Sequence, residues 1–331
     1  MREPERPRRE GGHRGLRLRI GVSLALLLLL ACFVDWGRLG ARLAGADPVL
    51  MLAVVLLATA DRLLMAWKWW LLVRSRDAAL GLWAAVRGYY LASFAGYFLP
   101  MTVGADAVRI GALAGTSRTA VLVASVVLER LIGALAQAVL AGLSVATLVT
   151  LGLGARVGPA ERWLLGAAVT LAFAAFPFTF PTARWVAARL DAGGGWRGAL
   201  RSLAEQYAGY GASTGLLCVF FALTLLEGGF PIAIHHTAGR ALGLDPGWTF
   251  FIATVPLVYL VARLPVSLGG LGFLELSFVS LAGLLGVAWT DAFAIAGLAT
   301  ALYMLALTPG AVLYLIPATP PIRPTPRERL P

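Results

Sequence analysis

Six charged residues are the strongest candidates for chemistry, because they lie within or beside segments that are otherwise apolar. They are Asp106, Arg109, Glu129, Arg130, Arg263 and Glu275. A charge at the centre of a bilayer costs roughly 3 kcal/mol on insertion scales, so it needs an opposite charge or a wet cavity. Guanidinium groups can hold a lipid phosphate, and carboxylates can neutralise them or relay protons. We therefore expect a shared polar interior, although buried ion pairs that only lock helix packing would leave the same pattern.

The spacing of these residues restricts which of them can pair. Asp106 and Arg109 are three apart, so they are neighbours if that segment is helical. Glu129 and Arg130 are adjacent, and consecutive residues of a helix point in different directions. Each of these two residues therefore needs a partner on another segment or a wet cavity.

Other polar residues are assigned structural roles. We expect Asp61, Arg62 and Glu227 to form ion pairs that hold helices together. Lys68 lies in the Trp67-Lys68-Trp69-Trp70 cluster, and aromatic residues beside basic ones are typical of a membrane interface. We therefore expect Lys68 to anchor the end of a span at that interface, and His235 and His236 to lie in a short loop after a span.

The chain lacks the motifs of common catalytic and ATP-binding sites. Lys68 is the only lysine and has no glycine-rich loop before it, so no Walker-A motif exists. There is no H-E-x-x-H and no C-x-x-C. Gly211-Ala212-Ser213-Thr214-Gly215 has the form of a serine-hydrolase elbow, but it opens an apolar span rather than joining a strand to a helix. We expect no catalytic residue, no metal and no cofactor.

The candidate residues must be positioned by membrane helices. Hydrophobic residues make up 59% of the 331 residues and charged residues 14%, against about 25% charged in soluble domains. Runs of about 18 or more apolar residues can cross the hydrocarbon core as helices, whereas open sheets cannot. The sequence predicts an all-α polytopic membrane protein with six to eight transmembrane helices. Six full spans are predicted, at residues 18–34, 48–66, 119–152, 163–180, 211–234 and 290–316.

Two further apolar segments, 81–115 and 248–286, are interrupted by the same short pattern. Leu99-Pro100-Met101-Thr102-Val103-Gly104 and Leu264-Pro265-Val266-Ser267-Leu268-Gly269 lie 165 residues apart, which is half the chain. Proline and glycine break helices, and matching breaks in two halves indicate an inverted-repeat transporter. We expect two re-entrant hairpins shaped by Pro100, Gly104, Pro265, Gly269 and Gly270. Chance recurrence of the pattern, or about eight full spans instead, remains the alternative.

Basic residues flank the membrane domain. A basic tail at 1–17 precedes a single transmembrane domain at 18–316, and a proline- and arginine-rich tail follows at 317–331. Basic clusters beside spans mark the cytoplasmic side and attract anionic lipid headgroups, so both termini are predicted to be cytoplasmic. The net charge of +11 is explained in this way, and we expect no nucleic-acid partner.

Three stretches carry the most specific pattern in the chain. They are Phe98-Leu99-Pro100 with Gly104, Asp106 and Arg109; Val127-Leu128-Glu129-Arg130-Leu131; and Arg263-Leu264-Pro265-Val266-Ser267 with Gly269-Gly270-Leu271-Gly272 and Glu275. Together they resemble the lysylphosphatidylglycerol synthase transmembrane region, also called the flippase-like family. The resemblance covers about residues 15–316. The chain departs from the family at Met101-Thr102, where a basic residue is usual.

The resemblance implies a multi-pass protein of the inner membrane of a bacterium or archaeon. In the two-part synthases this region moves aminoacylated phosphatidylglycerol between leaflets, and a separate soluble domain makes the lipid. We expect a stand-alone member that translocates an anionic phospholipid or isoprenoid-linked lipid, with Arg109 and Arg130 binding phosphate. The alternatives are a membrane enzyme acting on headgroups, or a non-transporting scaffold whose protein partner works in envelope lipid or glycan synthesis. The lipid and the oligomeric state are not determined.

Overall fold

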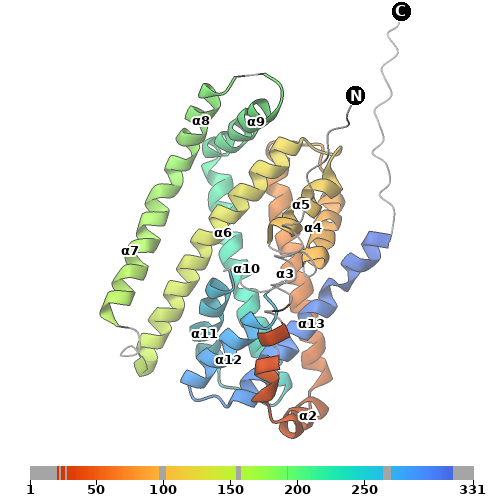
Figure 1. The fold of residues 1–331 in the computed structure, drawn as a ribbon, viewed down its shortest axis with the longest axis vertical. Coiled ribbons are helices and arrows are strands. Elements are labelled where there is room, and N and C mark those ends of the chain that lie inside the picture. Colours follow the sequence, from red (N-terminus) through yellow and green to blue (C-terminus); the bar gives the residue numbers. More distant parts are fainter. Residues whose placement is uncertain are drawn as a thin grey trace, which may run out of the picture.

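The protein is an all-α polytopic membrane protein (Figure 1). The computed structural model describes residues 21, 24–26, 28–96, 102–153, 158–191, 193–263 and 270–315. No strand occurs within these ranges, apart from one isolated bridge between Ala114 and Ser117. The helices are α2 (Trp36–Ala44), α3 (Pro48–Arg74), α4 (Leu82–Gly96), α5 (Thr102–Leu113), α6 (Thr119–Leu148), α7 (Pro159–Ala175), α8 (Thr179–Arg189), α9 (Trp196–Gly209), α10 (Thr214–Ala241), α11 (Trp248–Val261), α12 (Phe273–Leu284) and α13 (Trp289–Leu315).

Five helical segments in the described ranges are long and apolar enough to cross a bilayer. They are Pro48–Arg74, Thr119–Gly152, Gly166–Arg189, Thr214–Ala241 and Trp289–Leu315. They correspond to five of the six full spans predicted from the sequence. The sixth prediction, 18–34, lies partly outside the described residues. There, a helix at Leu24–Cys32 meets α2 at a bend of 95°.

Two spans extend further than the sequence indicated. Helix α3 continues through Lys68 to Arg74, and α10 continues through His235 and His236 to Ala241. The prediction that the two histidines lie in a loop is therefore wrong. Both are buried within α10, where aromatic rings of α11 and α12 pack on them, so tertiary contacts replace the water that a polar segment would otherwise need.

Four of the short helices form two pairs, and none of the four is long enough to span the membrane. α4, α5, α11 and α12 have 15, 12, 14 and 12 residues, so the longest reaches about 22 Å, against a hydrocarbon core of about 30 Å. α4 packs on α5, and α11 packs on α12. The first pair lies in the upper half of Figure 1, beside α8 and α9, and the second lies in the lower half near α2.

The residues predicted to shape the two breaks are only partly described. Pro100, Pro265 and Gly269 lie outside the described residues. Gly104 lies in the first turn of α5. Gly270 precedes α12 with φ 84°, a left-handed conformation that favours glycine.

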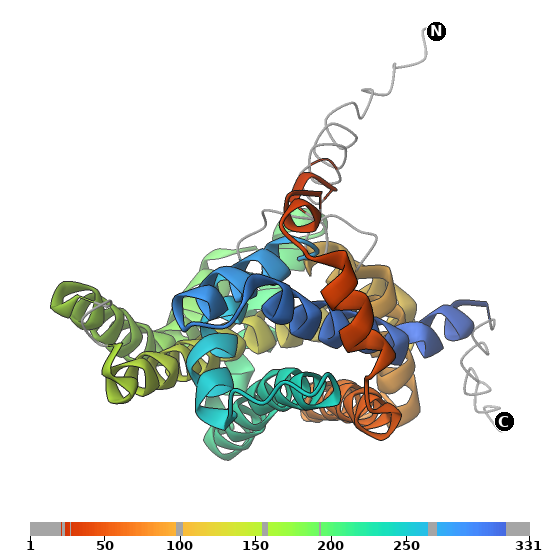
Figure 2. The same cartoon turned by 90° about the horizontal axis from the view of Figure 1, so that it is seen from below.

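The two halves of the chain repeat one order of helix lengths. Helices α3, α4, α5 and α6 have 27, 15, 12 and 30 residues, and α10, α11, α12 and α13 have 28, 14, 12 and 27. α3 packs on α10, and the two lie side by side in Figure 2. α4 packs on α13 as α11 packs on α6. Each short pair is thus held by the last long helix of the other half.

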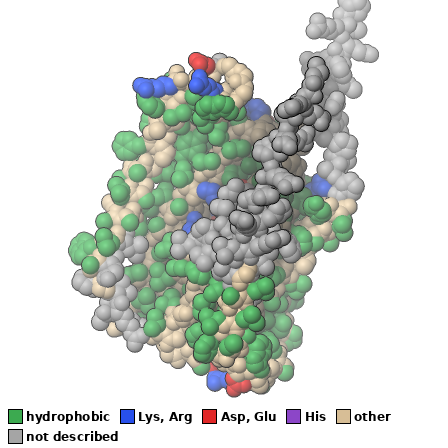
Figure 3. Space-filling view, viewed as in Figure 1, with side chains coloured by type: hydrophobic (Ala, Val, Ile, Leu, Met, Phe, Trp, Pro, Cys, Tyr) green, Lys and Arg blue, Asp and Glu red, His purple; other side chains and the backbone are tan. Residues whose placement is uncertain are grey.

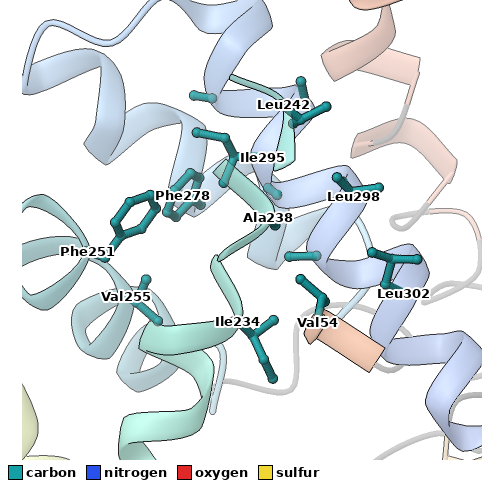
Figure 4. Close-up of a cluster of buried hydrophobic side chains, with 14 of the residues drawn as sticks. Val54, Ile234, Ala238, Leu242, Phe251, Val255, Phe278, Ile295, Leu298 and Leu302 are labelled. Carbon is teal, nitrogen blue, oxygen red and sulfur yellow. The ribbon is translucent and has the colours of Figure 1, made fainter. Parts of the chain in front are cut away.

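The largest apolar core lies where α10, α11, α12 and α13 meet α3. Figure 4 shows Phe251, Phe278 and Ile295 packed around Ala238 of α10, with Val54 of α3 nearby. The outer surface is also apolar, as the space-filling view shows (Figure 3). Trp163, Leu164 and Leu171 of α7 are each at least 69% exposed, as expected for a helix that faces lipid.

Candidate functional site

Arg109 lies at the centre of a buried polar cluster between α5 and α6. Its side chain is 3% exposed and sits on the face of α5 that turns toward the bundle. The guanidinium Nη2 lies 2.7 Å from Glu129 Oε2 on α6 and 3.0 Å from Asp106 Oδ1, one turn earlier on α5. Arg109 is thus bound by two carboxylates, one from each helix.

Aromatic rings complete the surroundings of Arg109. Its guanidinium carbon lies 4.4 Å from the ring centre of Trp69 on α3 and 4.7 Å from that of Tyr89 on α4. The Tyr89 hydroxyl donates to Glu129 Oε1 at 3.1 Å. Arg109 Nε and Nη1 have no hydrogen-bond partner, and cation–π contacts are the interaction left to the rest of the group. This arrangement holds the Arg109 charge in one place.

Asp106 joins the buried cluster to an outer arginine. Its Oδ2 accepts from Arg130 Nη2 at 2.8 Å and from Arg130 Nε at 3.1 Å, while its Oδ1 accepts from Arg109. The Arg130 side chain is 47% exposed. The neighbours Glu129 and Arg130 therefore face different partners, one inside the bundle and one at its surface.

Arg263 contacts α6 one turn after Arg130. It follows α11, its side chain is exposed, and Nη2 donates to the carbonyl of Gly133 at 2.9 Å. Gly133 is three residues after Arg130, so the two guanidinium groups lie along one edge of α6. The two positive charges, on Arg130 and Arg263, are close enough to repel each other. Figure 3 shows Lys or Arg side chains emerging at mid-height on a face that is otherwise apolar.

A second buried ion pair lies between α3 and α10. Lys68 Nζ contacts the Glu227 carboxylate and donates a hydrogen bond to Thr224 Oγ1 at 3.1 Å. The Lys68 side chain is 2% exposed. The predicted interfacial role of Lys68 is wrong, because this face of α3 packs on α10 and Glu227 neutralises the charge. The position of Lys68 in the chain could not reveal its partner. That the only lysine lies within an apolar stretch could have indicated a buried charge.

Asp61 and Arg62 extend this polar interior toward α13. Arg62 Nη2 lies 2.6 Å from Asp61 Oδ2, and its guanidinium carbon lies 5.2 Å from the ring centre of Tyr303. Asp61 is 2% exposed, and its Oδ1 has no hydrogen-bond partner. The ion pair is therefore formed between adjacent residues of α3 and not between two helices as expected, and one Asp61 oxygen accepts no hydrogen bond.

Glu275 stands apart from the Arg109 cluster. It is 4% exposed, in the first turn of α12, and lines a separate pocket near the second break. The structure therefore brings Asp106, Arg109, Glu129 and Arg130 together, places Arg263 one turn away, and puts Glu275 elsewhere. Sequence reasoning missed Trp69, Tyr89 and Tyr303, because aromatic residues in an apolar chain give no sign of which ring will meet a charge.

Comparison with known proteins was informative for one family only. The family model described as the lysylphosphatidylglycerol synthase TM region matches residues 17–310. No curated protein and no solved structure matches the chain significantly.

Proposed function

The chain belongs to the lysylphosphatidylglycerol synthase transmembrane-region family, and from this premise we propose that it moves a lipid with an anionic headgroup between the leaflets of a membrane. The family match supports a role connected with membrane lipids. The choice of translocation rests on the arrangement of charge in the transmembrane region, and above all on Arg130 with Arg263.

The observation that carries the proposal is a pair of exposed arginines at membrane depth. Arg130 is the twelfth residue of α6, so it lies about 16 Å from the start of that helix, about half the thickness of the hydrocarbon core. Exposed charge at this depth is costly unless water or a polar ligand reaches it. Arg263 adds a second guanidinium one turn away. Two arginines on one edge suit the oxygens of a lipid phosphate.

The buried cluster supports this pair from behind. Asp106 holds the Arg130 side chain in place, and Arg109 holds Asp106. A phosphate that binds Arg130 need only share that guanidinium with Asp106, because Asp106 keeps its bond to Arg109. We assign phosphate binding to Arg130 and Arg263, and assign to Arg109 the task of fixing the two carboxylates. The sequence-based expectation of direct phosphate binding by Arg109 is less suited to a side chain that is 3% exposed.

The repeated order of helix lengths in the two halves supports a route across the membrane. We propose that the α4–α5 and α11–α12 pairs are re-entrant hairpins that enter from opposite faces. Each contacts the long helix that ends the other half, so rocking of one half on the other at the α3–α10 interface would move both. Transporters built in this way expose a central site to each side in turn.

The charge distribution supports an orientation for the chain. The end of the bundle that carries the loops after α3, α5 and α8 is basic; its arginines are Arg74, Arg76, Arg118, Arg184, Arg189, Arg197 and Arg201. At the opposite end Asp291 binds both Arg38 and Arg42, whereas three of the seven arginines of the basic end, Arg118, Arg197 and Arg201, have an acidic partner. Following the positive-inside tendency, we propose that the basic end and both termini are cytoplasmic, in the inner membrane of a prokaryote.

The test is leaflet exchange of fluorescent phosphatidylglycerol in liposomes that contain the protein, with and without an imposed ion gradient. The double substitution Arg130→Ala with Arg263→Ala should lower the exchange rate at least about tenfold, the loss expected when charge-assisted bonds worth about 1.5–3 kcal/mol are removed. Arg197→Ala is the control, because that arginine lies in the first turn of α9, is 61% exposed and has Asp191 as its acidic partner. Absence of exchange for phosphatidylglycerol and for an isoprenoid-linked phosphate lipid would favour the scaffold or enzyme alternatives.

A further inference from the structure

A pocket beside the second break contains polar groups that the headgroup site does not use. It has a volume of about 190 Å³ and lies between α10, α11, α12 and α13. Its polar side chains are His235, Tyr259, Glu275, Thr300 and Tyr303. Ile234, which lines the pocket, also belongs to the apolar core shown in Figure 4.

Glu275 is held in one position at this pocket by two hydrogen bonds. Its Oε2 accepts from the backbone N–H of Gly272 at 2.7 Å, and its Oε1 accepts from the Thr300 hydroxyl at 2.7 Å. Both oxygens thus receive donors, and the carboxylate also lies at the N-terminal end of α12, where the helix dipole favours negative charge. Within the described residues, no cationic side chain forms an ion pair with Glu275. Glu275 therefore has no positively charged partner among the described residues.

His235 is the group in the pocket that can supply a positive charge. Its Nδ1 lies 2.8 Å from the carbonyl oxygen of Pro231, one turn earlier on α10. A carbonyl oxygen only accepts, so Nδ1 carries the hydrogen and Nε2 of the neutral ring carries the lone pair. His235 is 2% exposed, and its Nε2 has no hydrogen-bond partner. Because Nδ1 faces its own helix, Nε2 lies on the edge of the ring directed away from α10.

We propose that this pocket is a proton-binding site in which His235 Nε2 takes up the proton and Glu275 is the anion that stabilises the imidazolium. In the loading step an N–H bond forms at Nε2 and an O–H bond of a hydronium ion breaks, which leaves water. Unloading is the reverse step, with no change in any other covalent bond. The charge of the pocket changes from negative to neutral when it is loaded.

Three titratable groups line the pocket together with His235: Tyr259 on α11, Glu275 on α12 and Tyr303 on α13. The other charged or titratable groups on the surrounding helices are Arg62 of α3, which lies over the Tyr303 ring, its neighbour Asp61, and Glu227 and His236 of α10. Arg62 is bound to Asp61, so it does not cancel the charge of Glu275. Glu275 is therefore the carboxylate that shares the pocket lining with His235.

Proton binding would act on the second hairpin, and this step rests on the proposed function. Glu275 ties the start of α12 to α13 through Thr300. An imidazolium at His235 would compete with Thr300 for the carboxylate and would draw α12 toward α10. Tyr303 joins the same pocket to Arg62, and so to the polar interior that continues to Lys68 and Glu227. Loading would thus bias the position of the hairpin.

Nitrogen NMR of the histidine rings tests the site without any transport. The chain has only three histidines, His13, His235 and His236, so ¹⁵N-histidine labelling of the protein in lipid nanodiscs gives a spectrum that single His→Gln variants can assign. We expect His235 to show the Nδ1–H tautomer at high pH and to titrate reversibly as pH falls. Glu275→Gln should move the pH of half-protonation of His235 downward by about one unit, because the stabilising anion is lost. His236, which stacks on Trp248 at 3.9 Å and faces Asp245, is the internal control and should not move.

A His235 resonance that stays neutral from pH 8 to pH 4, or a titration that Glu275→Gln leaves unchanged, would overturn the proposal. These outcomes do not depend on lipid movement, so they are distinct from failure of the proposed function. Coupling is tested by lipid exchange under an imposed pH gradient. The unmodified protein and His236→Gln should exchange lipid several-fold faster with the gradient than without it, whereas His235→Gln should show no difference. Equal stimulation of both variants would refute coupling through this pocket.

Discussion

Removal of the Arg109 charge should destabilise the protein by leaving Glu129 buried without a close counter-charge. The substitution Arg109→Met keeps the length of the side chain and its packing on the Trp69 and Tyr89 rings. Asp106 would keep its ion pair with Arg130. Glu129, which is 9% exposed, would keep only the hydrogen bond from the Tyr89 hydroxyl.

The magnitude follows from what each carboxylate loses. Breaking a buried ion pair by removing one partner costs about 3–5 kcal/mol. The lower end of that range applies here, because only one of the two carboxylates is orphaned and the charge of Lys68 still acts on Glu129. We therefore expect Arg109→Met to lower the free energy of unfolding by about 3 kcal/mol. Adding Glu129→Gln should restore about 2 kcal/mol, because the amide is neutral and can still accept from Tyr89.

The assay is reversible unfolding in mixed micelles, measured for the unmodified protein, both single variants and the double variant. Glu129→Gln alone should cost less than Arg109→Met, since Arg109 would keep Asp106 and a carbonyl acceptor. The double-variant cycle then gives a coupling energy of at least about 2 kcal/mol between the two residues. If the double variant is as unstable as Arg109→Met, or less stable, an uncompensated Glu129 charge is not the cause and the electrostatic argument is refuted.

Two further predictions concern packing and pH. A Cβ at Gly310 would lie 2.5 Å from a backbone carbonyl oxygen of α4, so Gly310→Ala should cost about 1–3 kcal/mol in the same assay, whereas Gly297→Ala on the same helix, with open space, should cost little. Burial opposes ionisation of Asp77 in the loop after α3, but hydrogen bonds from the Arg118 backbone and the Ser117 hydroxyl hold the pKa of this carboxyl below its usual value. The stability this adds is complete above pH of about 4, the value for the unfolded chain, and is lost as pH falls through the lower folded value. Asp77→Asn should therefore be less stable than the unmodified protein at pH 7, with the difference in melting temperature shrinking below pH 4; a constant difference would contradict this.

The candidate site shows how far spacing can be used. Asp106 and Arg109 are three positions apart, and the predicted pairing is present at 3.0 Å. Adjacent Glu129 and Arg130 were expected to need different partners, and they have them. Spacing along one helix could not indicate which other segment supplies a partner. The contact between Arg109 and Glu129 depends on how α5 lies against α6, and that orientation is a property of the packed bundle.

The sequence by itself determined the membrane character, the helical class and five of the long spans. These features follow from the length of apolar runs, which acts locally and needs no partner. Only the tertiary structure decided that Lys68 is buried rather than interfacial, that the two histidines belong to α10, and that Arg130 and Arg263 share an edge. The cost of placing a charge in a bilayer depends on the partner it meets, and that partner lies about 160 residues away for Lys68 and 130 for Arg263.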